Sequence, residues 1–292
     1  MSKRAAALHL GLVGVFVAAS ASPARLQQAD ALDPARTLLF EARFSGAEKL
    51  ARARLADTEA ASGRDALAVA RVLDVLVEAL WRGGKIRTPE TLAFAERAIT
   101  IKESQLGPEH PEVAYSLATL GVVLRLRGDY TGAKSVFARA LTIQERDLGP
   151  LLPDLARTLS MAATLALDTG DLRGAETLHE RALAIRQKVL APGDPAVAES
   201  LGGLGVVRER QGDGSGAQRY HEQALAIREK ALGPAHPDVA TSLNNLANVK
   251  GDIGDYAAAR SLHERALSIR ERALEPDHPD VAMSLNNLAV AI

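Results

Sequence analysis

Apolar residues recur at helical spacing through most of the chain, and one stretch near the C-terminal end shows the pattern most clearly. Ala240, Leu243, Leu246 and Ala247 follow the i, i+3, i+6, i+7 spacing that places side chains on one face of an α-helix. After a short break, a second stretch repeats this one-sided pattern with Ala259, Leu262, Ala266, Leu267 and Ile269. The two stretches predict a pair of α-helices, each with one buried face.

Residues with suitable chemistry mark the ends of both predicted helices. Pro237 suits the first helical position, because its fixed φ fits there and its missing N–H would have no partner. Gly254 is placed to end the first helix, and the Asp255 carboxylate can accept hydrogen bonds from the free amides of the second. Earlier copies end in Leu-Gly-Pro, as at 106–108, where we expect glycine to take the left-handed helical conformation.

The helix pair belongs to an array with a period of 42 residues. The dipeptide His236-Pro237 has counterparts that begin at residues 110, 152, 194 and 278, and Gly-Asp pairs begin at residues 128, 170, 212 and 254. Small residues, among them Ala140, Ala182 and Ala224, recur where two helices must approach closely. Two landmarks with one period predict a stack of repeats that contact only their neighbours.

The combined motifs make the array resemble a known family. They are Leu-Asn-Asn-Leu-Ala, Gly-Asp-Tyr, Arg-Ala-Leu-x-Ile-Arg-Glu and Gly-Pro-x-His-Pro-Asp, spread over about residues 66–292. This pattern resembles the tetratricopeptide repeat, in the longer form found in kinesin light chains and in many bacterial proteins. The resemblance implies an all-α fold, a right-handed superhelical α-solenoid of antiparallel helix pairs, with a concave groove lined by the first helix of each pair.

The chain divides into three predicted parts. They are residues 1–24, a signal peptide or short membrane anchor; residues 25–65, degenerate N-terminal capping helices; and residues 66–292, an array with repeats at 66–109, 110–151, 152–193, 194–235 and 236–277 and a half-repeat at 278–292. The half-repeat ends on Leu288-Ala289-Val290-Ala291-Ile292, which would leave an apolar face uncovered. We therefore expect the natural protein to continue past this point.

The first residues resemble a targeting signal. Lys3 and Arg4 precede an uncharged run from Ala5 to Ala24, and Ala19-Ser20-Ala21 offers an A-x-A cleavage site. The pattern predicts an exported protein, periplasmic or extracellular. The alternative is a protein anchored in the membrane through residues 5–24, because about 20 apolar residues can span a bilayer.

Composition excludes several classes of function. The 35 basic and 36 acidic residues leave a net charge of −1, so the chain lacks the general basic footprint of a nucleic-acid-binding protein. There is no cysteine, which removes disulfides, thiol catalysis and cysteine-ligated zinc. We predict no cofactor, no metal and no nucleic-acid partner.

Histidine and glycine are the residues most easily mistaken for catalytic or ligand-binding groups. His110, His236 and His278 precede prolines at predicted helix starts, which favours a capping role. Three others, His179, His221 and His263, share their position with Phe137, so a packing role for a ring explains them better than metal binding.

Gly202-Gly203-Leu204-Gly205 lacks the preceding strand and the Lys-Ser/Thr of a phosphate loop. Each of its glycines costs about 0.5–1 kcal/mol in a helix relative to alanine. We therefore expect local opening in the repeat at 194–235, and we predict that the chain is not an enzyme.

The predicted function is a protein–protein interaction scaffold that binds a peptide or partner segment in its groove. One alternative is the N-terminal sensor or scaffold part of a larger bacterial enzyme, such as a caspase-like peptidase, and another is an architectural spacer. Helical spacing places thirteen residues of the first helices in the groove: Tyr115, Thr119, Val122, Arg157, Met161, Thr164, Thr241, Asn244, Asn245, Asn248, Asp252, Asn286 and Asn287. By resemblance to kinesin light chains, the recurring asparagines would contact the backbone of an extended peptide.

Overall fold

The computed structural model describes residues 34–146 and 152–290, and every element in these ranges is an α-helix. The helices are α2 (Pro34–Phe40), α3 (Phe44–Ser62), α4 (Leu67–Arg82), α5 (Pro89–Leu106), α6 (Pro111–Leu126), α7 (Tyr130–Arg146), α8 (Leu152–Asp168), α9 (Leu172–Val189), α10 (Pro195–Arg210), α11 (Gly214–Leu232), α12 (Pro237–Asp252), α13 (Tyr256–Ala273) and α14 (Pro279–Val290). The predicted signal or anchor segment lies outside the described residues, as does the break at 148–150.

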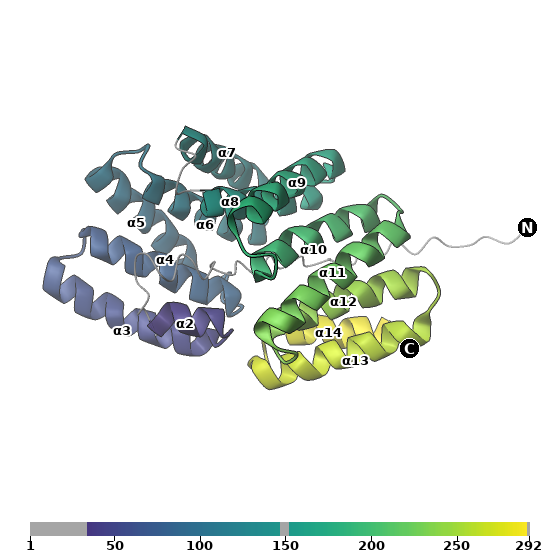
Figure 1. Cartoon of the computed structure of the whole chain (residues 1–292). Coiled ribbons are helices and arrows are strands. Elements are labelled where there is room, and N and C mark those ends of the chain that lie inside the picture. The colour runs from purple at the N-terminus through teal and green to yellow at the C-terminus, as the bar shows by residue number, and fades with distance from the viewer. Residues whose placement is uncertain (1–33, 147–151, 291–292) are drawn as a thin grey trace, which may run out of the picture.

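The helices form antiparallel pairs that follow the period read from the sequence (Figure 1). The pairs α4/α5, α6/α7, α8/α9, α10/α11 and α12/α13 occupy the five predicted full repeats, and α14 occupies the half-repeat. Helices α2 and α3 lie in the segment predicted to cap the array. The predicted all-α solenoid is confirmed.

The predicted helix starts are confirmed in their chemical detail. Helix α12 begins at Pro237, and the Nδ1 atom of the preceding His236 accepts a hydrogen bond from the Asp238 backbone N–H at 3.1 Å. Helix α13 begins after Asp255, whose carboxylate accepts a bond from the backbone N–H of Ala258 at 3.2 Å. These side chains satisfy amides that have no partner inside the helix.

The glycines that end the second helices differ from the prediction in one respect. Gly107 has φ 88° and ψ 154°, and Gly233 has φ 84° and ψ 157°. These angles are not those of the left-handed helix, which has ψ near 45°; they lie in an extended region with positive φ that is almost restricted to glycine. The need for glycine is therefore stricter than the sequence indicated.

The hydrophobic core is a series of small clusters along the stack. One cluster joins Val239, Ala240 and Leu243 of α12 to Ala266 and Ile269 of α13. The alanines at the expected close approaches are buried, with Ala140, Ala182, Ala224 and Ala266 each 0% exposed. A methyl group at these positions lets the two helices of a pair pack closely.

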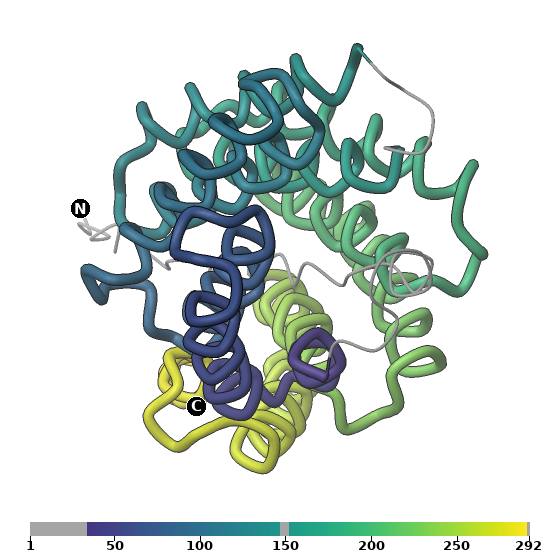
Figure 2. Tube along the Cα trace, turned by 90° about the vertical axis from the view of Figure 1, so that its left-hand side faces the viewer, coloured from purple at the N-terminus to yellow at the C-terminus, as the bar shows by residue number. Residues whose placement is uncertain are grey.

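The stack curves through one turn of a superhelix. Successive first helices contact one another along its inner side, α4 with α6, α6 with α8, α8 with α10 and α10 with α12. The turn brings the start of the C-terminal helix α14 to the end of α4 and the start of α3, where His278 contacts Arg82 and Phe44. Figure 2 shows the C-terminal and N-terminal parts of the chain at the same place on the turn. The inner side is therefore enclosed by the chain along one full turn.

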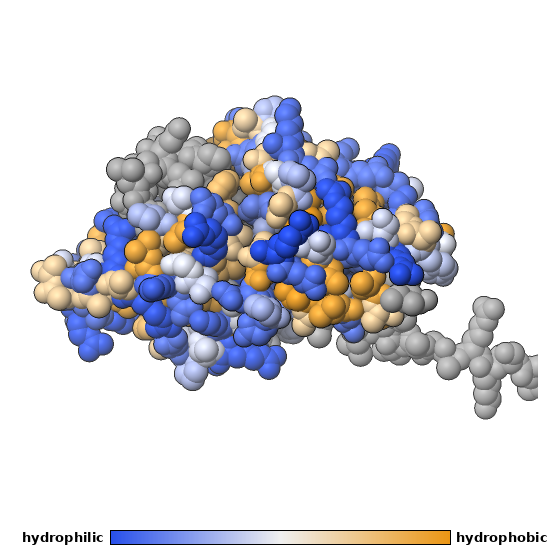
Figure 3. Space-filling model, turned by 90° about the horizontal axis from the view of Figure 1, so that it is seen from below, coloured by the Kyte–Doolittle hydropathy of each residue, from blue (hydrophilic) through white to orange (hydrophobic). Residues whose placement is uncertain are grey.

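Much of the face of the molecule seen in Figure 3 is hydrophilic. In the view from below, apolar residues occur in small groups bordered by hydrophilic ones (Figure 3). Among the described helices, none combines the length and the apolar character needed to cross a membrane.

Candidate functional site

A column of buried polar side chains runs along the second helices, one in each repeat. We call it the polar column; its members, spaced 42 residues apart, are Lys102, Gln144, Arg186, Arg228 and Arg270. Four of them reach a serine on the first helix of the next repeat, fourteen residues further along the chain. These four members therefore join their repeat to the next through a hydrogen bond in a buried position.

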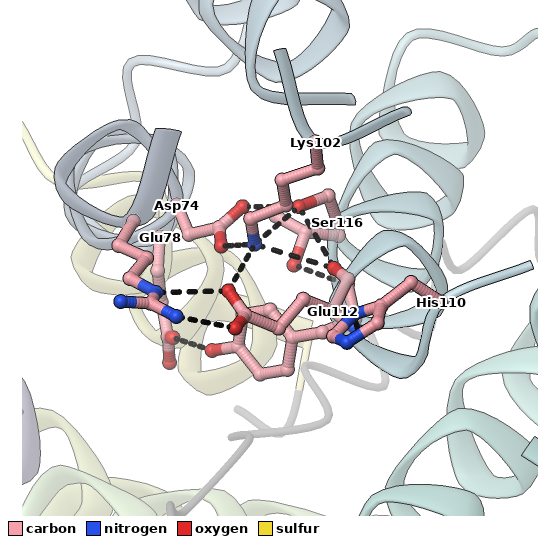
Figure 4. Close-up of polar contacts among 9 residues, drawn as sticks. Asp74, Glu78, Lys102, His110, Glu112 and Ser116 are labelled. Atoms are coloured by element: carbon pink, nitrogen blue, oxygen red, sulfur yellow. Dashed lines mark hydrogen bonds and ion pairs between the residues drawn. The ribbon is translucent and has the colours of Figure 1, made fainter. Parts of the chain in front are cut away.

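The first member of the column has a complete set of partners (Figure 4). Lys102 Nζ lies 2.5 Å from Asp74 Oδ2 and 3.0 Å from Ser116 Oγ, and it also donates to the Glu112 backbone oxygen at 3.2 Å. Ser116 Oγ donates to the other oxygen of Asp74 at 2.6 Å. The ammonium charge is thus neutralised and its donors are used, which offsets the cost of burying it.

The later members have fewer charged partners. Arg186 donates to Ser160 and Ser200 and pairs with Glu199 at 3.0 Å. Arg228 donates to Ser242 at 2.6 Å, and burial lowers its pKa although Asp238 and Glu199 oppose the shift. Burial likewise lowers the pKa of Arg270, whose nearest carboxylate, Asp280, lies 4.0 Å away.

The histidines that share a position with Phe137 pack as rings, as predicted. His179 and His221 are 0% exposed and His263 is 5% exposed. Burial lowers the pKa of His179 to about 3, and the positive charge of Arg186 adds to the shift. The three side chains occupy the ring positions between first and second helices.

Two of the glycines at 202–205 have a packing function that the sequence analysis did not anticipate. A Cβ on Gly203 would lie 2.2 Å from His179 Cε1, and a Cβ on Gly205 would lie 2.4 Å from His221 Cε1. Gly121 stands in the same relation to Phe137, at 2.6 Å. A Cβ on Gly202 would meet no atom within 4 Å. Gly203 and Gly205 therefore make room for the rings, whereas Gly202 does not.

The thirteen predicted groove residues lie at different depths. Tyr115, Thr119, Val122, Met161, Thr164, Asn244 and Asn245 are buried; Arg157, Thr241, Asn248 and Asn287 are half-buried; Asp252 and Asn286 are exposed. Two of the asparagines bind each other within the protein. Asn287 Nδ2 donates to Asn244 Oδ1 at 2.7 Å, and this bond joins α14 to α12. Helical spacing placed these residues on one face, and contacts between first helices then buried about half of them.

One cluster on the first helices combines charge with unused hydrogen-bonding capacity. The Arg157 guanidinium lies over the Tyr115 ring, 4.6 Å from its centroid. Arg157 Nη2 and Glu199 Oε1 are buried atoms with no hydrogen-bond partner among the residues described. Burial raises the pKa of Glu199, while the charges of Arg186 and Arg228 act against that rise. The prediction included Tyr115 and Arg157 but missed Glu199, which occupies the same position in the next repeat.

The sequence carried a signal for the polar column that the prediction did not use. Its arginines end the recurring Ala-Leu-x-Ile-Arg motif, and three of its four serines directly precede a buried leucine of a first helix, as in Ser242-Leu243. A charged residue that recurs on the apolar face of a helix, with a hydroxyl at a fixed distance along the chain, indicates a buried pair.

No group of three or more His, Asp or Glu side chains suited to a metal ion occurs within residues 34–146 and 152–290. The ionisable residues of these ranges are engaged mainly in caps, the polar column and ion pairs between repeats. An example of the last kind is Arg139 with Glu103, at 2.6 Å.

Comparison with known proteins supports the helical-repeat fold. A family model described as tetratricopeptide repeat matches residues 87–146, 117–188, 154–230, 197–271 and 238–291. No curated protein matches the sequence. Among solved structures, BtubC (BKLC) from P. vanneervenii is 22% identical, with a TM-score of 0.56 over 68% of this chain and 81% of its own.

A second solved structure is a putative kinesin light chain from Podospora anserina with nearly identical TPR-like repeats. It is 24% identical, with a TM-score of 0.52 over 69% of this chain and 95% of its own. The matches of the family model overlap from residue 87 to residue 291, well over half of the sequence. The chain belongs to the tetratricopeptide repeat family and is built as a scaffold for protein–protein interaction.

Proposed function

We propose that this protein is a non-catalytic scaffold that binds an extended peptide segment of a partner protein on the inner side of its superhelix. The observation that supports the proposal most directly is the pair of unused polar atoms on neighbouring first helices, Arg157 Nη2 and Glu199 Oε1. A buried polar atom without a partner costs about 1–3 kcal/mol, so a ligand that satisfies both atoms would recover that energy.

A peptide backbone matches the chemistry of these two atoms. Its carbonyl oxygen accepts a hydrogen bond, as Arg157 requires, and its N–H donates one, as the Glu199 carboxylate requires. The half-buried Asn248 amide, on α12, could add a further donor and acceptor. The partner is accordingly a protein segment bound mainly through its backbone, with no cofactor, metal or nucleic acid involved.

The compartment of this binding follows from the sequence analysis. We propose that the protein acts outside the cytoplasm, on the strength of the basic residues and the apolar run at its start. Detection of the chain in the cytosolic fraction alone would contradict this part of the proposal.

The test compares two variants of the full chain. Partners are captured from the exported fraction, identified, and their affinities measured by calorimetry. Replacing Arg157 with Met and Glu199 with Gln should weaken binding about tenfold or more, since each hydrogen bond to a charged group contributes about 1.5–3 kcal/mol. The matched control is Arg265→Met, because Arg265 is an exposed second-helix arginine paired with Glu229 at 2.5 Å.

Equal affinity of the double variant and the control would place binding away from the inner side. Failure of the chain to bind any protein would favour the spacer alternative.

A further inference from the structure

Two histidines join the ends of the superhelical turn. His236 Nε2 lies 3.0 Å from the backbone oxygen of Phe40, and His278 Nε2 lies 2.8 Å from that of Arg82. Each pair is separated by 196 residues in the sequence. Figure 2 shows the C-terminal repeats returning to the N-terminal helices around the turn. The contacts therefore connect the last repeats of the array to its first helices.

The helix caps fix the chemistry of both rings. His236 Nδ1 accepts the backbone N–H of Asp238, and His278 Nδ1 accepts that of Asp280, each at 3.1 Å. An imidazole nitrogen that accepts a hydrogen bond carries no proton, so in the neutral ring the proton sits on Nε2. Both rings then point a donor at a carbonyl oxygen of the opposite end.

The two carbonyl groups are ready to accept these bonds. Phe40 is the last residue of α2 and Arg82 is the last residue of α4. The final carbonyl groups of a helix have no partner inside it. Each histidine thus caps the start of one helix and the end of another.

Packing at the His278 contact supports the two hydrogen bonds. The Phe44 ring lies 6.2 Å from the His278 ring, centroid to centroid, and the Arg82 guanidinium lies 4.9 Å from the Phe44 centroid. Gly84 has φ 79°, and a Cβ there would lie 2.6 Å from Pro279 Cδ. The backbone of the α4–α5 turn therefore touches the start of α14 closely.

The chain contains an internal comparison for this arrangement. His110 precedes Pro111 and caps α6 in the same way, with Nδ1 accepting the Glu112 N–H at 3.2 Å. Among the described residues its Nε2 makes no second bond. The helix cap made by Nδ1 is thus common to all three histidines. The additional Nε2 bond is made by His236 and His278, which lie where the last repeats contact the first helices.

We propose that Phe44, Gly84, His236 and His278 form a latch that closes the superhelical turn and controls access to its inner side. This inference rests on the proposed function, because it assigns the latch a role in admitting the partner segment. With the latch closed, a segment reaches the inner side along the superhelix axis; with the latch open, it enters from the side.

The first experiment measures the distance across the latch. The chain has no cysteine, so Arg87→Cys and Asp277→Cys, both at exposed positions, accept a donor and an acceptor dye without background. In this background His236 and His278 are both replaced by Asn, which keeps a side-chain oxygen for each helix cap but removes the Nε2 donor. Single-molecule energy transfer should show a longer mean distance in the double variant and an unchanged distance in the matched control His110→Asn.

The second experiment measures access to the inner side. Asn248→Cys places a single thiol on a half-buried position of α12, and its reaction with a polyethylene glycol maleimide is followed by a mass shift. The double histidine variant should react at least tenfold faster than its parent, and the His110→Asn control should react at the parent rate.

Phe44→Leu provides a second route to opening, because it leaves every helix cap intact, and it should give the same direction of change. If folded His236→Asn/His278→Asn and Phe44→Leu proteins keep both the parent distance and the parent reaction rate, the latch is refuted. Neither measurement uses a partner, so that outcome would leave the proposed binding function standing.

Discussion

The junction between α5 and α6 and the junction between α11 and α12 occupy the same place in the repeat but differ in electrostatics. At the first, the buried cation Lys102 lies 2.5 Å from the Asp74 carboxylate and 3.0 Å from Ser116. At the second, Arg228 donates to the Ser242 hydroxyl at 2.6 Å, and Asp238 acts on it from further away. The serine is common to both junctions, and the close carboxylate is present only at the first.

This difference teaches that the period of the repeat sets where a buried polar group lies, but not how its charge is balanced. A buried ion pair is costly to break, because removal of one partner leaves the other charge without compensation. Removal of a hydroxyl that binds a buried guanidinium should cost less stability, because it removes one hydrogen bond and no counter-charge. The two junctions should therefore respond differently when the nearest polar partner of the buried cation is removed, the Asp74 carboxylate at the first and the Ser242 hydroxyl at the second.

The largest expected effect is at the first junction. Asp74→Ala should lower the free energy of unfolding by about 3–5 kcal/mol, because Lys102 would remain buried without its counter-charge. Ser242→Ala at the second junction should cost less, about 1.5–3 kcal/mol, since it removes one hydrogen bond to a charged group. Urea unfolding followed by circular dichroism compares the two, and an equal or larger loss in Ser242→Ala would contradict the distinction.

The buried ring position of the repeat gives a second contrast, between His179 and Phe137, that depends on pH. The pKa of His179 is about 3 in the folded protein and 6.5 in its reference state, so between these values the unfolded chain binds more protons. Stability should therefore be lost as pH falls from 6.5 toward 3, by about 1 kcal/mol per pH unit from this residue.

His179→Phe removes that contribution, because phenylalanine, which stands at the equivalent position 137, does not titrate. Urea midpoints measured at several pH values should fall less steeply in the variant than in the parent. Carboxylates contribute equally to both proteins, so parallel pH profiles would show that His179 is protonated without cost.

The smallest expected effects on stability come from alanine substitutions at two glycines of α10, Gly203 and Gly202. Gly203→Ala should destabilise the protein by about 1–3 kcal/mol through overpacking against His179. Gly202→Ala should stabilise it by about 0.5–1 kcal/mol, because its Cβ enters open space and alanine favours the helix. Thermal unfolding measures whether each variant is more or less stable than the parent. A stabilised Gly203→Ala protein would mean that the His179 ring moves aside easily.

The glycine contrast refines the expectation that the repeat at 194–235 opens locally. Glycine weakens α10 as an isolated helix, yet Gly203 and Gly205 admit two buried rings that α10 would otherwise exclude. Hydrogen exchange along α10 tests the balance, and the prediction of local opening fails if its amides are the most protected in the array.

Much of the candidate site was accessible from the sequence, because a helix face is a local property. Spacing placed Tyr115, Arg157 and Asn248 on one side of their helices. It did not reveal that Asn244 would bond to Asn287, or that Glu199 would lie near Arg157 with an oxygen unused. These facts depend on the distance between successive first helices, which the pattern within one repeat does not specify.

By itself the sequence determined the local structure of this protein. A period of 42 residues, prolines at helix starts, capping aspartates and histidines, and glycines with positive φ mark the helices residue by residue, because each signal acts within one turn of backbone. Only the tertiary structure decided the meeting of His278 with Arg82, since it depends on small rotations that accumulate over every repeat between them. No single repeat encodes that sum, and the closure of the superhelical turn emerges from the whole array.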